Sequence, residues 1–171
     1  MAAKTETEAL IGERARDNTS LLNKWILLAI FLFFTMGLGA LVGASTPPGE
    51  WYANLDKPFF NPPNWLFGPV WTLLYAMVAI AGWRTWLKGY KGLAMQIWFG
   101  QFALNLTWSP IFFGLQQKGL ALFVIAGMIG LTTVFVRLTW KPDRNTALLM
   151  LPYLAWISFA ALLNATLWLM N

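Results

Sequence analysis

The chain has 171 residues and a formal net charge of +5, and 58% of its residues are apolar while only 11% are charged. Soluble domains average roughly 45–50% apolar and about 25% charged residues, so this composition predicts a single membrane domain. Cysteine and histidine are both absent, which excludes disulfides, thiolate nucleophiles, imidazole acid–base catalysis and the metal sites that depend on these side chains.

The first 23 residues are polar and carry both signs of charge, which predicts a soluble tail or a short surface helix. They lack the basic segment, short apolar core and small-residue cleavage site of a secretory signal. The apolar stretch at residues 25–45 is long enough to cross a bilayer, because about 20 helical residues span the hydrocarbon core. We therefore expect an uncleaved first span and a transmembrane domain over residues 24–171.

Residues 46–65 hold five of the nine prolines. Proline lacks an amide donor and disfavours helical geometry in the residue before it, so this segment is predicted to be a long first loop rather than a helix. Four more apolar stretches follow at residues 66–87, 93–114, 119–137 and 146–170. The joints between them are short, which indicates antiparallel neighbours. The predicted fold is an all-α membrane protein, a bundle of five transmembrane helices.

The basic residues are distributed unevenly over the two ends of this bundle. Two of them, Lys57 and Lys118, fall on the side of the Pro-rich loop. The remaining ten fall on the opposite side: Lys4, Arg14, Arg16, Lys24, Arg84, Lys88, Lys91, Arg137, Lys141 and Arg144. The positive-inside rule then predicts a cytoplasmic N-terminus, and the absence of a cleaved signal favours a bacterial inner membrane. Because these residues flank spans rather than form a stripe, we expect a bilayer partner and no nucleic acid.

No Asp, Glu, Lys or Arg lies inside the predicted spans except at their edges. Pumps and proton relays usually carry intramembrane charge, so the sequence argues against ion-coupled transport. Any ligand path through this protein is therefore expected to be neutral.

Three of the predicted spans carry a face on which aromatic and polar side chains recur at helical spacing. The third span has two amides on this face, and they must point into the bundle because an amide facing lipid leaves its hydrogen-bonding groups unmet. Such faces fit core packing and interhelical contacts as well as a ligand cavity. The residues are Phe67, Trp71 and Tyr75; Trp98, Gln101, Asn105, Trp108 and Phe112; and Tyr153, Trp156, Ala160 and Asn164.

The first span contains Gly39 and Gly43 in a Gly-x-x-x-Gly arrangement. Small residues at this spacing let helices approach closely, either within one chain or between protomers. The pattern is common, and it does not identify the partner helix.

Several segments resemble the translocator protein family, also called tryptophan-rich sensory proteins, the TspO/MBR or peripheral-type benzodiazepine receptor family. Residues 51–63, WYANLDKPFFNPP, are similar to the family pattern WYxxLxKPxWxPP, with Phe60 in place of the usual Trp. Residues 67–75 (FGPVWTLLY), 101–113 (QFALNLTWSPIFF) and 152–164 (PYLAWISFAALLN) resemble later family motifs in the same order. The resemblance covers residues 25–170.

This resemblance implies a five-helix bundle, commonly a homodimer, with a pocket closed by the first loop for porphyrins, sterols and synthetic benzodiazepine-type ligands. In the family the residues at Trp71 and Trp156 face a bound tetrapyrrole. Leu120 stands where animal members have Trp, and the end of the chain lacks the Tyr and basic residue of a proposed sterol motif. The residues that the resemblance places in the pocket are Tyr52, Pro62, Phe67, Trp71, Tyr75, Asn105, Trp108, Trp156, Ala160 and Leu163.

Three functional hypotheses follow. The first is a non-enzymatic transport or sensory protein that needs no cofactor and no metal, and that binds protoporphyrin IX or a haem-like tetrapyrrole as its ligand. In it, Trp71, Tyr52 and Asn105 donate hydrogen bonds to the ligand, and Lys57 adds charge at the mouth. The second is light-dependent oxidative degradation of bound protoporphyrin, with Trp71 and Trp156 as the oxidisable residues. The third is a structural subunit whose N-terminal tail contacts a partner protein.

Overall fold

The computed structural model describes residues 2–89 and 92–171, with side chains described from Ser20 onward. This part of the chain is helical and contains no strand. Most of the predicted polar tail and the basic residues Lys4, Arg14, Arg16 and Lys91 lie outside the described side chains. The helices are α1 (Ala2–Ser45), α2 (Glu50–Ala53), α3 (Asn64–Gly89), α4 (Leu93–Ser109), the π-helical turn η1 (Pro110–Gly114), α5 (Lys118–Trp140) and α6 (Arg144–Met170).

The prediction of an all-α, multi-pass membrane protein is confirmed, although the structure does not establish the count of five spans. Within the described residues, four helices are long and apolar enough to cross a bilayer: Ser20–Ser45 of α1, α3, α5 and α6. The fifth predicted span, residues 93–114, is divided between α4, which has 17 residues, and η1. The division falls at Pro110, which has no amide to donate, and Leu115 N–H bonds the carbonyl of Pro110 at 2.8 Å in the wider turn of a π-helix.

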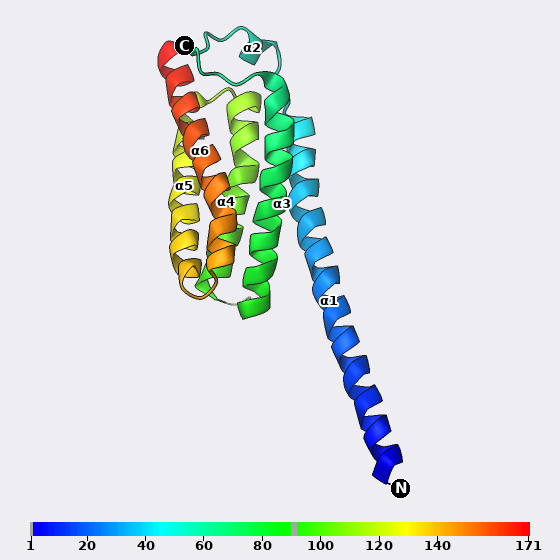
Figure 1. Ribbon diagram of the computed structural model, residues 1–171. Coiled ribbons are helices and arrows are strands. Elements are labelled where there is room, and N and C mark those ends of the chain that lie inside the picture. The colour runs from blue at the N-terminus through cyan, green and yellow to red at the C-terminus, as the bar shows by residue number, and fades with distance from the viewer. Residues whose placement is uncertain (1, 90–91) are drawn as a thin grey trace.

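The helices α3, α4, α5 and α6 stand side by side, and α1 lies along the outer side of α3 (Figure 1). The half of this bundle away from the loop is packed around Trp98, which is 0% exposed and donates to the carbonyl of Val78 at 3.0 Å. Its ring contacts Phe31 and Phe102 at centroid distances of 5.4 and 5.5 Å. A Cβ at Gly82 would lie 2.5 Å from the Trp98 ring, so α3 approaches α4 closely only because glycine stands there.

The Pro-rich segment between α1 and α3 crosses the opposite end of the bundle and contains the short helix α2 (Figure 1). Asn171 ties it to the end of α6, because its side-chain amide accepts from Asp56 N–H at 2.9 Å and donates to Asp56 C=O at 3.1 Å. The loop is therefore fastened over this end of the bundle.

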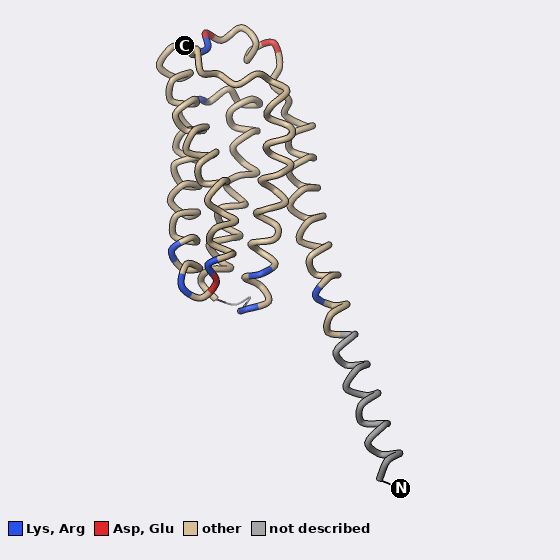
Figure 2. The backbone as a smooth tube through the Cα atoms, in the orientation of Figure 1, with Lys and Arg blue, Asp and Glu red and all other residues tan. Residues whose placement is uncertain are grey.

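The described charges gather at the two ends of the bundle and leave its middle neutral (Figure 2). The loop end carries both signs, with Glu50, Asp56, Lys57 and Lys118. The other end is dominated by basic residues. Those described there are Lys24, Arg84, Lys88, Arg137, Lys141 and Arg144.

At this basic end, Asp143 clamps the end of α3 to the start of α6. Arg84 donates to its two carboxylate oxygens at 2.8 and 3.2 Å, and Lys88 lies at 3.2 Å. The hydroxyl of Thr146 donates to the same carboxylate at 2.7 Å, and the backbone N–H of Thr146 donates to Asp143 Oδ1 at 3.4 Å, which caps α6. Burial alone opposes ionisation of Asp143, but these hydrogen bonds outweigh it and hold the pKa of Asp143 well below its usual value.

Asp143→Asn should destabilise the protein at neutral pH by about 1–3 kcal/mol, since it removes the charge that Arg84 and Lys88 share. A carboxylate whose pKa is lowered by folding stabilises the protein above its unfolded-state pKa, about 3.9. That stabilisation is lost as the pH falls toward the lower folded-state pKa. Thermal denaturation in detergent should therefore show a gap in melting temperature between the two proteins at neutral pH that narrows progressively as the pH falls below about 4. A difference in melting temperature that stays constant across this pH range would show that the charge of Asp143 does not stabilise the protein.

Candidate ligand-binding cavity

A cavity of about 570 Å³ lies in the half of the bundle nearest the loop. It is enclosed by α1, α3, α4, η1, α5 and α6, and by the loop residues Pro48 and Tyr52. None of the described residues that line it carries a charge. Its size falls within the range of small-molecule sites, which are mostly apolar with a few placed polar groups.

The structure brings nine of the ten predicted site residues to this one cavity. They come from the loop and from α3, α4 and α6, whose patterned faces converge there. Pro62 is the exception: it lines a smaller hollow beneath the loop instead. The nine are Tyr52, Phe67, Trp71, Tyr75, Asn105, Trp108, Trp156, Ala160 and Leu163.

Aromatic rings form much of the wall and hold one another in place. Trp71 packs against Tyr75 at a centroid distance of 5.3 Å, and Phe67 meets Trp156 edge to face at 6.1 Å. Trp108 is stacked on Phe112 at 5.1 Å. Offset and edge-to-face pairs of this kind add about 0.5–1.5 kcal/mol beyond burial, so the rings are fixed before any ligand arrives.

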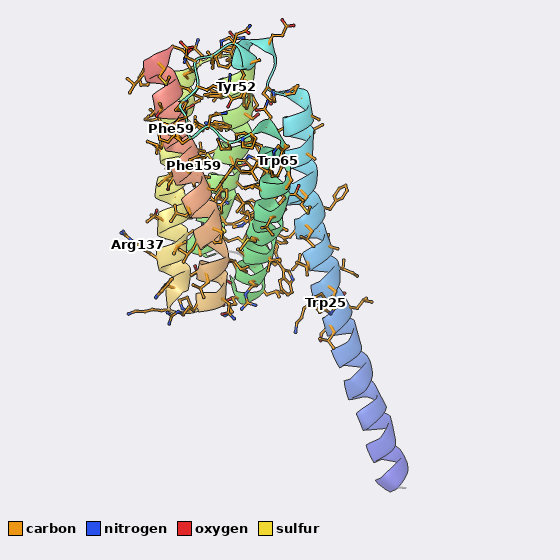
Figure 3. The ribbon with its side chains drawn as sticks, turned by 45° about the horizontal axis from the view of Figure 1, so that its top comes forward. Trp25, Tyr52, Phe59, Trp65, Arg137 and Phe159 are labelled. Carbon is orange, nitrogen blue, oxygen red and sulfur yellow. The ribbon has the colours of Figure 1, made fainter. Side chains whose placement is uncertain are left out.

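Some aromatic residues of this chain lie outside the cavity, Trp25 and Trp65 among them. Trp25 is 62% exposed and Trp65 is 72% exposed, and both lie on the outside of the bundle, whereas Tyr52 lies beneath the loop (Figure 3). The high tryptophan content therefore combines a cavity wall with an outer surface that suits the bilayer.

A chain of hydrogen bonds joins three helices below the cavity. Tyr75 of α3 donates to Asn105 Oδ1 at 2.7 Å, and Asn105 Nδ2 donates to the hydroxyl of Tyr153 on α6 at 3.1 Å. Asn105 was expected to donate a hydrogen bond to the ligand. Its amide oxygen and its amide nitrogen are instead both hydrogen-bonded within the protein. Tyr52 was expected to do the same, and its hydroxyl instead donates to Asn61 Oδ1 at 3.0 Å.

Two buried polar atoms in the cavity wall have no hydrogen-bond partner among the described residues. They are the indole N–H of Trp108 and the side-chain carbonyl oxygen of Asn164. Buried polar groups are normally paired, so an unpaired donor and an unpaired acceptor beside a cavity mark positions where a ligand or a water can bond. Asn164 belongs to the patterned face of α6 but not to the residues that the family resemblance singled out.

The α1 side of the cavity was missed by sequence reasoning. Gly39 and Gly43 were interpreted as a helix-contact pattern, and this holds for Gly39, which faces the ring of Tyr75. A Cβ at Gly43 would meet no atom within 4 Å, and Gly43 faces the cavity instead. The remaining lining residues of α1 are Met36, Ala40 and Val42, and Thr46 directly after the helix lines the cavity as well.

The lining residues that are also exposed on the outside of the molecule gather in one place. They belong to the loop, to α1 and to α3, while α4, α5 and α6 contribute none. The most exposed part of the cavity lining therefore lies on the loop, α1 and α3. These exposed lining residues are Ala40, Gly43, Pro48, Asn64, Gly68 and Thr72.

The smaller hollow beneath the loop adjoins the cavity, since both are lined by Pro48, Tyr52 and Asn64. It contains Lys57, whose ammonium donates to the carbonyls of Ala53 and Leu55 at 2.8 and 3.1 Å. An ammonium has three N–H groups, so one remains for an anionic group at the mouth of the cavity.

The sequence matches the TspO/MBR family over residues 28–169. It is 43% identical over 151 residues to "Tryptophan-rich protein TspO" of Archaeoglobus fulgidus, covering 85% of this chain and 96% of the relative. It is 39% identical over 143 residues to the human "Translocator protein", covering 77% and 82% of the two chains. The "Tryptophan-rich sensory protein" of Cereibacter sphaeroides is 36% identical over 138 residues, with 80% and 87% covered.

Gly39→Ala should destabilise the protein, because the added Cβ would lie 2.7 Å from Tyr75 Cζ, and the Tyr75 hydroxyl is held by Asn105. Overpacking of this kind costs about 1–3 kcal/mol. Gly37→Ala is the matched control, since a Cβ there meets no atom within 4 Å and helical Ala is favoured over Gly by up to about 1 kcal/mol. In thermal denaturation, Gly39→Ala should melt at a lower temperature than Gly37→Ala. Equal melting temperatures would mean that α1 does not pack closely against the ring of Tyr75.

Proposed function

We propose that this chain, which belongs to the TspO/MBR family, binds a tetrapyrrole of the porphyrin type in its intramembrane cavity and serves in the transport or sensing of that ligand. Relatives carry the names translocator protein and tryptophan-rich sensory protein. The proposal concerns a binding protein rather than an enzyme.

The observation that carries this proposal is a charge-free cavity walled by Trp71, Trp108 and Trp156. A porphyrin is a flat apolar ring, and indole and phenol faces can stack on it or enclose it. The wall rings are already fixed by their neighbours, so little side-chain entropy is lost when a rigid disc enters. These features favour a rigid aromatic ligand over a flexible chain.

The acidic edge of a porphyrin needs a different environment from its ring. In the proposed complex the carboxylates lie toward the hollow beneath the loop, where Lys57 retains an N–H. The indole N–H of Trp108 supplies a further donor within the cavity. The ring thus occupies the neutral part of the site and the charged groups lie at its mouth.

We also propose that α4 and η1 together form a fifth span, from Leu93 to Gly114, which places the loop and the C-terminus on the same side. The basic end of the bundle then faces the cytoplasm by the positive-inside rule. A cytoplasmic N-terminus and a bacterial inner membrane, with a homodimer as the assembly, complete the proposal.

The double variant Trp71→Phe with Trp156→Phe should bind protoporphyrin IX about 10-fold more weakly, because two indole contacts are reduced. The shift of the porphyrin absorption band on titration into detergent-solubilised protein measures the dissociation constant without relying on tryptophan fluorescence. The matched control is Trp25→Phe with Trp65→Phe, two exposed residues outside the cavity, which should leave the affinity unchanged. Loss of affinity in the control alone would place the binding site on the outer surface.

A further inference from the structure

The side-chain carbonyl of Asn164 is a buried hydrogen-bond acceptor without a donor among the described residues. Asn164 lies on α6, is 1% exposed and lines the cavity. An unmet polar group in a membrane interior raises the free energy of the protein, because no bulk water is present to satisfy it. A ligand that brings a donor to this oxygen removes that cost on binding.

The identity of the free atom is fixed by the chemistry of the neighbouring helix. Asn164 Nδ2 lies 2.9 Å from the carbonyl oxygen of Lys118, the first residue of α5. Since Lys118 C=O is an acceptor only, the amide must present its NH₂ group there, and a flipped amide would set two oxygens against each other. The atom left unpaired is therefore the oxygen, and only a donor can satisfy it.

Asn105 is a buried amide whose oxygen and nitrogen both form hydrogen bonds with other residues of the bundle. Its oxygen accepts from Tyr75 and its nitrogen donates to Tyr153, so both ends are paired. Asn164 has only half of its amide used in this way. Asn164 is thus set apart by two observations together: its oxygen has no donor among the described residues, and the residue lines the cavity.

We propose that Asn164 is a specificity-determining residue that selects tetrapyrroles with a neutral hydrogen-bond donor, such as a hydroxyl group, on the periphery of the ring. This inference rests on the proposed function and names the ligand chemistry that the same cavity prefers. A neutral donor is required because no charged residue lines the cavity in the described part of the chain. A hydroxyl also has lone pairs, so it is compatible with the unpaired indole N–H of Trp108.

Two porphyrins that differ only in the presence of peripheral hydroxyl groups provide the test. Haematoporphyrin and mesoporphyrin share the ring and both propionates, but the first carries two hydroxyethyl groups where the second carries ethyl groups. Dissociation constants for both are measured on the full chain and on Asn164→Leu, in the same detergent. The variant should shift the ratio of the two constants by at least about 5-fold in favour of mesoporphyrin, because the hydroxyl loses its acceptor.

Gln101→Leu is the matched control. Gln101 is also a fully buried amide with no hydrogen-bond partner among the described residues, but it does not line the cavity. Its variant should keep the wild-type ratio. Because each ratio compares two ligands on one protein, a general loss of stability cancels, and mesoporphyrin binding itself shows that a variant is folded. If Asn164→Leu binds neither porphyrin, Asn164→Ala gives the same comparison.

The outcomes separate this inference from the proposed function. A ratio that is unchanged in the Asn164 variants, with mesoporphyrin bound, overturns the role of Asn164 and indicates that a water satisfies its oxygen. A ratio of dissociation constants that changes equally in Gln101→Leu also overturns the role of Asn164. Failure of the wild-type protein to bind either porphyrin overturns the proposed function, and the inference falls with it.

Discussion

The hydrogen-bonded chain Tyr75–Asn105–Tyr153 fixes the spacing of the helices that surround the cavity. It ties α3, α4 and α6 together at the level where the packed core around Trp98 gives way to the cavity. Lipid offers no alternative partners for these groups, so the three helices hold their spacing in order to keep them paired. Because Tyr75 is fixed in this way, Gly39 of α1 can close against its ring while the next turn of α1 stays open toward the cavity.

Three amide side chains, those of Asn105, Asn171 and Asn164, differ in how far the protein itself pairs their polar atoms. Asn105 is fully engaged by the protein, Asn171 fastens the loop to α6, and Asn164 retains a free oxygen in the cavity wall. In a soluble protein, water would pair the polar atoms that the protein leaves unpaired, and such differences would matter less. In the proposed complex they are the main source of specificity, since aromatic walls recognise shape but discriminate poorly between polar substituents.

The sequence predicted the helical membrane fold and the convergence of α3, α4 and α6, because helical periodicity and the cost of an unmet amide in lipid act locally along each span. It could not separate a solid core from a cavity. Trp98 and Trp108 stand on the same face of α4 with the same periodicity, yet one fills the core and the other lines the cavity. That outcome depends on the neighbouring helix, where Gly82 admits a ring and Gly43 leaves space. For the same reason the pairing of Asn105 and Tyr52 within the protein, and the displacement of Pro62 to the neighbouring hollow, could not be predicted from spacing.

The central claim is that the bundle encloses a neutral, indole-walled chamber that accepts a porphyrin ring. An experimental structure of the protein with protoporphyrin IX tests it most directly. The account predicts density for the ring between Trp71 and Trp156, with the propionates toward Lys57. Density confined to the lipid-facing surface, with the side chains of α3, α4 and α6 closed over the chamber, would contradict it.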